Sequence, residues 1–180
     1  DVRISDNTVS YMEAAYQFYL ELINVNGFYL HASAIVVDGK AYLFSAESGT
    51  GKSTQAQLWH SLENAAIING DRGIIQDMQD HFRVWGSPYA GSSSVYTNTS
   101  VPIRAIVVLS QASQNTLRRL TPVAAFTHLY RESTVLSWDD GFVDGASALL
   151  LRLIDHVPVY HLSCRPDAEA VSILKEELVK

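Results

Sequence analysis

The fold of this chain is decided by the ten residues Ser45-Ala46-Glu47-Ser48-Gly49-Thr50-Gly51-Lys52-Ser53-Thr54. An apolar run, 41–44, precedes this stretch, and a run with helical character, 55–59, follows it. The stretch is therefore predicted to be a glycine-rich turn between a strand and a helix, which is where phosphate-binding loops occur. Small residues let successive backbone N–H groups converge on phosphate oxygens, and the helix start adds a partial positive charge.

In a loop of this kind the lysine, here Lys52, reaches the outer phosphates of a nucleotide, and the hydroxyl of Ser53 binds Mg²⁺. Ala46 occupies the place of the first glycine in the usual pattern G-x-x-x-x-G-K-[ST], while GTGKST is intact. A flexible Gly/Ser turn without a ligand is the alternative interpretation. The helical and apolar flanks favour the nucleotide site.

Length and composition indicate one ordinary globular domain over residues 1–180, because 47% of the residues are hydrophobic and 18% are charged. The net charge of −6 argues against duplex nucleic acid and anionic membrane surfaces as partners. No apolar run is long enough to span a membrane and no signal peptide is visible, so a cytoplasmic protein is expected. The single cysteine, Cys164, excludes an intrachain disulfide.

The remaining pattern predicts an α/β domain with a mixed sheet flanked by helices. Ser10 and Glu13 have the spacing of a capping box, and an amphipathic helix at about 10–23 is expected to pack on the domain as part of segment 1–27. Strands 28–37 and 40–44 form a hairpin around Asp38-Gly39, a dipeptide suited to a tight turn. Further strands are expected at 65–68, 74–75, 82–85, 103–109, 115–120 and 157–162. Further helices are expected at 53–62, at 121–130, within 133–156 with interruptions near 139–141 and Gly145, and after Pro166.

Asp71 follows the short strand 65–68, at an end of the sheet where ligands are handled. A phosphate loop needs such a carboxylate, either as a metal partner or as the base that accepts the proton of an attacking hydroxyl. Arg72 is suited to offset charge on the γ-phosphate. The alternative interpretations are structural: Asp71 is a turn residue, Arg72 is an exposed loop arginine, and His31 is a core histidine with satisfied hydrogen bonds. The small-residue loop 86–94 is typical of segments that bind ligands.

The segment LHASAIVVDGKAYLFSAESGTGKST, together with INGDR, resembles the HPr kinase family and its relative, the ATP-dependent phosphoenolpyruvate carboxykinase. GSPYAG and VPVYHLSCRPD are similar to segments of small proteins in this group. The resemblance implies a single-domain HPr kinase/phosphoenolpyruvate carboxykinase-like fold with a P-loop. It also implies that the nucleotide phosphates and Mg²⁺ are held by Ser48, Gly49, Thr50, Gly51, Lys52, Ser53 and Thr54.

The same resemblance gives Asp71 the role of second aspartate of a pair, as metal partner or base, and brings His31 near the reacting phosphate. Gly70 stands where the first aspartate would be; an alignment shifted by one makes Asp71 the first aspartate and Arg72 the replacement for the second. In either alignment one carboxylate is lost. The resemblance is compatible with a homo-oligomer in which a neighbouring subunit supplies an arginine.

These observations predict an ATP- and Mg²⁺-dependent kinase that transfers the γ-phosphoryl group to a hydroxyl, such as a serine of a small protein or precursor peptide. Lys52, Asp71, His31 and Arg72 are the candidate catalytic residues, and Ser53 and Asp71 the candidate metal ligands. The alternative is a module of the same fold that binds ATP for regulation or scaffolding without transferring phosphate. A GTPase is disfavoured because no N-K-x-D motif is present.

Overall fold

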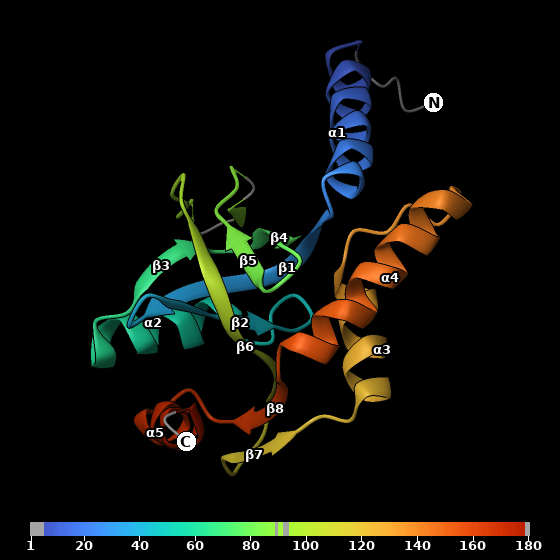
Figure 1. Ribbon diagram of the computed structural model, residues 1–180. Helices are drawn as coiled ribbons and strands as arrows, with labels where there is room; N and C mark the ends of the chain where they lie inside the picture. The colour runs from blue at the N-terminus through green and yellow to red at the C-terminus, as the bar shows by residue number, and fades with distance from the viewer. Residues whose placement is uncertain (1–5, 89, 92–93, 179–180) are drawn as a thin grey trace.

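The computed structural model describes residues 6–88, 90–91 and 94–178. Over these residues the chain forms five helices and eight strands (Figure 1). The helices are α1 (Asp6–Asn24), α2 (Lys52–Glu63), α3 (Pro122–Glu132), α4 (Asp140–His156) and α5 (Ala168–Leu178). The strands are β1 (Gly27–Val37), β2 (Lys40–Ser45), β3 (Ala66–Asn69), β4 (Arg72–Asp77), β5 (Phe82–Trp85), β6 (Ser100–Gln111), β7 (Thr116–Arg119) and β8 (Val159–Cys164).

The strands form a mixed sheet, which confirms the α/β architecture with a mixed sheet that the sequence predicted. Strand β6 pairs in parallel with β2 and with β8, and the other paired strands are antiparallel. The long strand β1 changes partners along its length, because residues 27–31 pair with β4 and residues 32–37 pair with β2. Strand β3 pairs with residues 34–36 of β1. His31 is thus the last β1 residue paired with β4.

The hairpin predicted at Asp38-Gly39 is present. Val37 pairs with Lys40, and the two residues between them have φ angles of 49° and 71°. Positive φ at both central residues matches the right-handed twist of the flanking strands. This turn fixes the register of β2 against β1 and therefore the position of the loop that follows β2.

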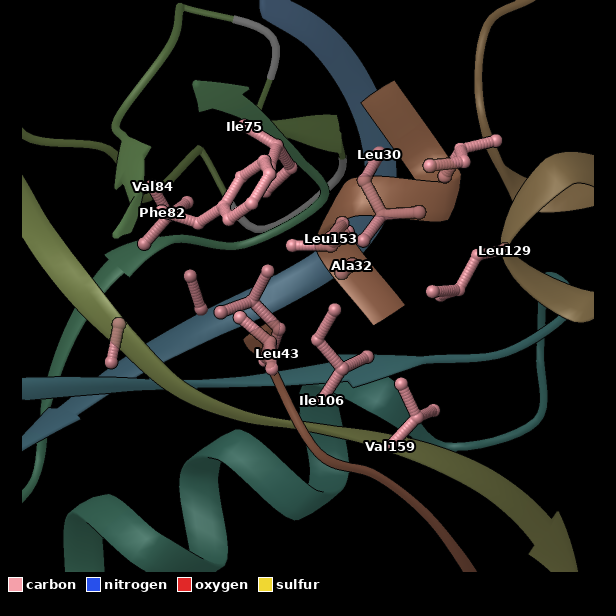
Figure 2. Close-up of a cluster of buried hydrophobic side chains, with 14 of the residues drawn as sticks. Leu30, Ala32, Leu43, Ile75, Phe82, Val84, Ile106, Leu129, Leu153 and Val159 are labelled. Atoms are coloured by element: carbon pink, nitrogen blue, oxygen red, sulfur yellow. The ribbon is translucent and has the colours of Figure 1, made fainter. Parts of the chain in front are cut away.

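Side chains that alternate along the strands fill two hydrophobic clusters, one on each face of the sheet. On β6, Ile106 and Val108 belong to the cluster that also contains residues of α3 and α4, whereas Val107 and Leu109 belong to the cluster with residues of α2 and α5. Figure 2 shows the first cluster, in which Leu129 from α3 and Leu153 from α4 are drawn with residues of the sheet. The sheet is thus covered by helices on both faces.

Two details of the predicted helices are wrong. The first helix begins at Asp6, so Ser10 lies inside α1 and is not its N-cap. In the region 133–156, residues 133–139 are outside any helix, and α4 then runs without interruption through Gly145. A Cβ atom at Gly145 would lie 2.8 Å from Cγ2 of Ile23 in α1. This glycine therefore serves close packing between two helices and does not break one.

In the part of the chain that the structure describes, no helix is both long enough and apolar enough to cross a membrane.

Candidate functional site

The loop between β2 and α2, residues 46–51, lies at one edge of the sheet and is called the glycine-rich loop below. Gly49 and Gly51 have φ angles of 79° and 122°, which side chains other than glycine rarely adopt. Gly51 is the N-cap of α2, so no side chain caps the helix there, and the first turn contains no acidic residue. The N-terminus of α2 is therefore suited to an anion.

Lys52, the first residue of α2, is a buried cation. Its side chain returns over the loop, and Nζ donates hydrogen bonds to the carbonyl oxygens of Ala46, at 2.9 Å, and Glu47, at 3.3 Å. Burial lowers the pKa of Lys52, while the negative charges of Asp71 and Glu132 act in the opposite direction. A buried ammonium that is held only by carbonyl groups gains from an anionic partner.

The other predicted loop residues are placed around this lysine. Ser48, Gly49, Ser53 and Thr54 are exposed, whereas Thr50 and Gly51 are half-buried. The Ser53 hydroxyl stands on the first turn of α2, where solvent or a ligand reaches it. Ser48 to Thr54 therefore form a continuous accessible surface around the N-terminus of α2.

Asp71 is brought to the same edge of the sheet by backbone contacts. The N–H of Ala32 in β1 donates to the carbonyl oxygen of Asp71 at 2.8 Å, and the N–H of Asp71 donates to Oδ1 of Asn69 at 2.9 Å. The Ser33 hydroxyl donates to the carbonyl oxygen of Gly70 at 2.7 Å. The carboxylate of Asp71 therefore stands on a fixed backbone beside β1.

His31 and Arg72 both contact this carboxylate. Nε2 of His31 lies 3.1 Å from Oδ1 of Asp71, and Nε of Arg72 lies 3.8 Å from Oδ2. Arg72 begins β4 and pairs with His31 across the strands, with a half-exposed side chain. Three of the predicted catalytic residues thus meet at one point of the structure.

Glu132, which the sequence did not reveal, is the fourth member of this cluster. It ends α3, its side chain is buried, and its Oε2 lies 3.0 Å from Nδ1 of His31. Both ring nitrogens of His31 therefore face a carboxylate. Arg131 contacts Glu132 at 3.5 Å and Glu47 of the glycine-rich loop at 3.0 Å. The end of α3 is thus tied both to His31 and to the loop.

His128, one turn earlier in α3, approaches the end of β2. Its Nε2 lies 3.3 Å from Oγ of Ser45, and this hydroxyl also donates to the carbonyl oxygen of His31 at 3.1 Å. Burial is the main reason why the pKa of His128 is lowered. The histidine therefore remains a neutral hydrogen-bonding group across most of the neutral pH range.

A family model described as "SynChlorMet cassette protein ScmC" matches residues 3–167 of the chain. The chain belongs to the ScmC family. Among solved structures, the HPr(Ser) kinase/phosphatase from Coxiella burnetii is distantly similar to it, with a TM-score of 0.47 and 12% sequence identity over 84% of this chain and 93% of that chain. No curated protein matched the chain in sequence.

Two cavities of the ScmC-family chain border the glycine-rich loop. One, of about 590 Å³, lies toward α3 and has charged and polar walls that include Glu47, Arg131, His128 and His161. The other, of about 390 Å³, lies toward α5 and has walls from α2, the end of β6 and residues 164–166. A ligand held on the loop therefore has a polar neighbourhood on one side and a more apolar one on the other.

The sequence offered a signal for the loop, for Asp71 and for His31, but little for the α3 residues. Glu132 and His128 belong to a helix whose sequence carries no motif, and only their distance to β1 and β2 reveals them. Within the described residues, no group of three or more His, Cys, Asp or Glu side chains is arranged to hold a metal ion. The loop 86–94 falls partly outside the described residues, although Gly91 is described and lies against Asp71.

Proposed function

We propose that this chain is an ATP- and Mg²⁺-dependent kinase that transfers the γ-phosphoryl group to a hydroxyl, most simply a serine of a small protein or precursor peptide. One observation carries the proposal: the buried Lys52 and the cluster of Asp71, His31 and Glu132 face the same edge of the sheet. The negative charges of Asp71 and Glu132 both act to raise the pKa of Lys52. A cation for the phosphates and a carboxylate for the acceptor are the parts that phosphoryl transfer requires.

In this proposal the triphosphate replaces the present hydrogen-bond partners of Lys52. The ammonium group exchanges its two loop carbonyls for oxygens of the β- and γ-phosphates, which form stronger, charge-assisted hydrogen bonds. The uncapped N-terminus of α2 adds backbone N–H donors. The phosphates would then lie along residues 48–54, the range expected from the sequence.

Mg²⁺ fits the donors present at this edge. The exposed Ser53 hydroxyl and the Asp71 carboxylate supply oxygen ligands, which Mg²⁺ prefers, and the ion is completed by phosphate oxygens and water. When bound, it neutralises charge on the phosphates. A magnesium ion that accompanies a nucleotide is usually bound by few protein groups together with phosphate oxygens and water.

Asp71 has the environment of a residue that orients or deprotonates an acceptor. Its Oδ1 is held by His31, and Oδ2 lies toward Arg72, whose contact of 3.8 Å is loose. In the transfer step the acceptor oxygen forms a bond to the γ-phosphorus, the bond from that phosphorus to the bridging oxygen breaks, ADP leaves, and the hydroxyl proton passes to Asp71. Arg72 offsets the charge on the transferred group.

The second carboxylate that the sequence lacked beside Asp71 is supplied in this proposal by Glu132. It does not touch the position of the acceptor, because His31 lies between it and Asp71. It is a positioning residue: it holds Nδ1 of His31, so Nε2 points at Asp71. The loop 86–94 is the candidate acceptor surface, since Gly91 packs against the Asp71 side chain.

Incubation with γ-labelled ATP, Mg²⁺ and serine-containing peptides tests the proposal. Wild type is expected to label a peptide, while Asp71→Asn, which keeps the size of the side chain, loses transfer and still binds ATP. Transfer that is equal in wild type and Asp71→Asn would contradict the assignment of Asp71. Stabilisation of the wild type by ATP without transfer to any acceptor would favour the alternative, a module that only binds ATP.

A further inference from the structure

The smaller cavity beside the glycine-rich loop has the features of a site for a flat, mostly apolar group. Its walls include Leu109, Ala112, Cys164 and Pro166, and its volume of about 390 Å³ lies within the range of small-molecule sites. Gly49, Thr50 and Gly51 form one of its borders, so the cavity is continuous with the surface proposed for the phosphates.

Gln55, on the first turn of α2, lines this cavity and has a polar group without a partner. Its side chain is 2% exposed, and Nε2 has no hydrogen-bond partner among the described residues. A buried donor that lacks a partner costs free energy, and such groups in native proteins call for an explanation. A ligand atom that accepts a hydrogen bond from Nε2 would be a direct explanation, because Gln55 already lines the cavity in which that atom would lie.

We propose that this cavity binds the purine base of the nucleoside triphosphate and that the Gln55 amide donates a hydrogen bond to a ring nitrogen of the base. The inference rests on the proposed function, which places the phosphates on the loop. A purine is flat, its faces are apolar and its edge carries ring nitrogens that accept hydrogen bonds. It therefore suits a cavity whose walls combine apolar residues such as Leu109 and Pro166 with polar ones, among them the buried amide of Gln55.

The other cavity is less suited to a base. Its walls carry Glu47, Arg131, His128 and His161, and Arg131 pairs with Glu47 across it. Charged walls favour a polar group such as part of the acceptor. In the smaller cavity, by contrast, the one charged wall residue, Arg165, is already paired with Asp167 at 2.9 Å and Glu169 at 3.0 Å.

The test compares ATP with inorganic tripolyphosphate, which lacks the base, in wild type and in Gln55→Leu. Calorimetry is expected to show that wild type binds ATP more tightly than tripolyphosphate. Loss of one hydrogen bond should weaken ATP binding to the variant by about 10-fold and leave tripolyphosphate binding unchanged. The melting temperature of the ligand-free variant should not fall, since leucine removes an unpaired donor, and this shows that the variant folds.

Four outcomes overturn the inference. Equal ATP affinity in the two proteins removes the role of Gln55, and an equal loss of tripolyphosphate affinity shows damage to the loop. If wild type binds tripolyphosphate as tightly as ATP, the base site fails while the phosphate site stands. If wild type binds neither compound, the proposed function fails and the base site with it.

Cys164 provides a second measurement that needs no variant. It lines the cavity and is the single cysteine of the chain, so alkylation by N-ethylmaleimide reports on this cavity alone. Burial raises the pKa of the Cys164 thiol, so the reaction is run at mildly alkaline pH. ATP should slow alkylation several-fold and tripolyphosphate should not. Equal rates with and without ATP would contradict a base in this cavity.

Discussion

Nδ1 of His31 lies 3.0 Å from Oε2 of Glu132, a residue 101 positions further along the chain. This contact joins the end of α3 to β1 and places a buried carboxylate behind the histidine that faces Asp71. It changes how the cluster is understood, because a histidine held on both sides has a fixed orientation.

Replacing Glu132 with Gln should reduce the rate of phosphoryl transfer by about 10- to 100-fold, the loss that follows removal of groups that orient a site residue. Affinity for ATP should change less than the transfer rate, because Glu132 contacts His31 directly and acts on Lys52 only through its charge. Steady-state kinetics with saturating ATP measure the first effect and calorimetry the second. Glu13→Gln, an exposed change in α1, is the matched control. A change in KM for ATP without a change in kcat would contradict the positioning role.

Replacing Lys52 with Met keeps most of the length of the side chain and removes its charge. ATP affinity should fall at least about 10-fold, since charge-assisted hydrogen bonds to phosphate are lost. Thermal stabilisation by ATP measures the loss. The ligand-free variant should remain folded, because in wild type the hydrogen bonds of Nζ to described residues are two, both to carbonyl groups of the loop. Undiminished stabilisation by ATP would place the nucleotide elsewhere on the molecule.

Gly91→Ala should impair transfer through Asp71. A Cβ atom at this position would lie 2.8 Å from Cγ and 2.9 Å from Cβ of Asp71, and the φ angle of Gly91 is 57°. The Asp71 side chain must therefore move, so the transfer rate should fall while ATP still binds. Gly39→Ala is the matched control, because φ there is 71° and nothing lies within 4 Å of the added atom. Equal activity in the two variants would show that the position of Asp71 is unimportant.

Arg152→Ala should destabilise the fold at neutral pH and less so in acid. Arg152 of α4 hydrogen-bonds both carboxylate oxygens of Asp77 at the end of β4, and this bond is the main cause that lowers the pKa of Asp77. A carboxyl group with a lowered pKa stabilises the fold above its ordinary value of 3.8, and this contribution is lost as the pH falls through the lowered value.

The melting temperatures of wild type and Arg152→Ala should therefore differ by a few degrees at pH 7 and converge as the pH falls below 3.8 and through the lowered pKa of Asp77. Circular dichroism at several pH values measures this. Arg119→Ala serves as the control, since Arg119 is exposed and has no ion pair with a described residue. A difference that stays constant with pH would assign the effect to packing of the arginine side chain.

Local chemistry made much of the fold predictable. Asp38-Gly39 required a tight hairpin, and the glycines of the loop match backbone angles that other residues avoid. Apolar runs in β1, β2 and β6 predicted strands. These signals lie within a few residues of the structure that they specify, so a single sequence displays them.

The rest depended on distances between segments far apart in the chain. Glu132 lies in the last turn of an ordinary amphipathic helix, and nothing near it in the sequence indicates a partner in β1. Gly145 was predicted to interrupt a helix because the sequence does not show that it packs against Ile23 of α1, a residue far away in the chain. The partnerless amide of Gln55 could not be foreseen either, since burial of that side chain depends on how α2 packs.

The 101-residue separation of His31 and Glu132 also sets the order in which the protein can become active during synthesis. A growing chain releases β1, the glycine-rich loop and Asp71 long before α3. Until α3 docks on the sheet, Nδ1 of His31 lacks its carboxylate, and the loop lacks its link to Arg131. A nascent chain should therefore acquire the surface proposed for the phosphates before it acquires the aligned histidine, so the proposed binding would precede the proposed transfer.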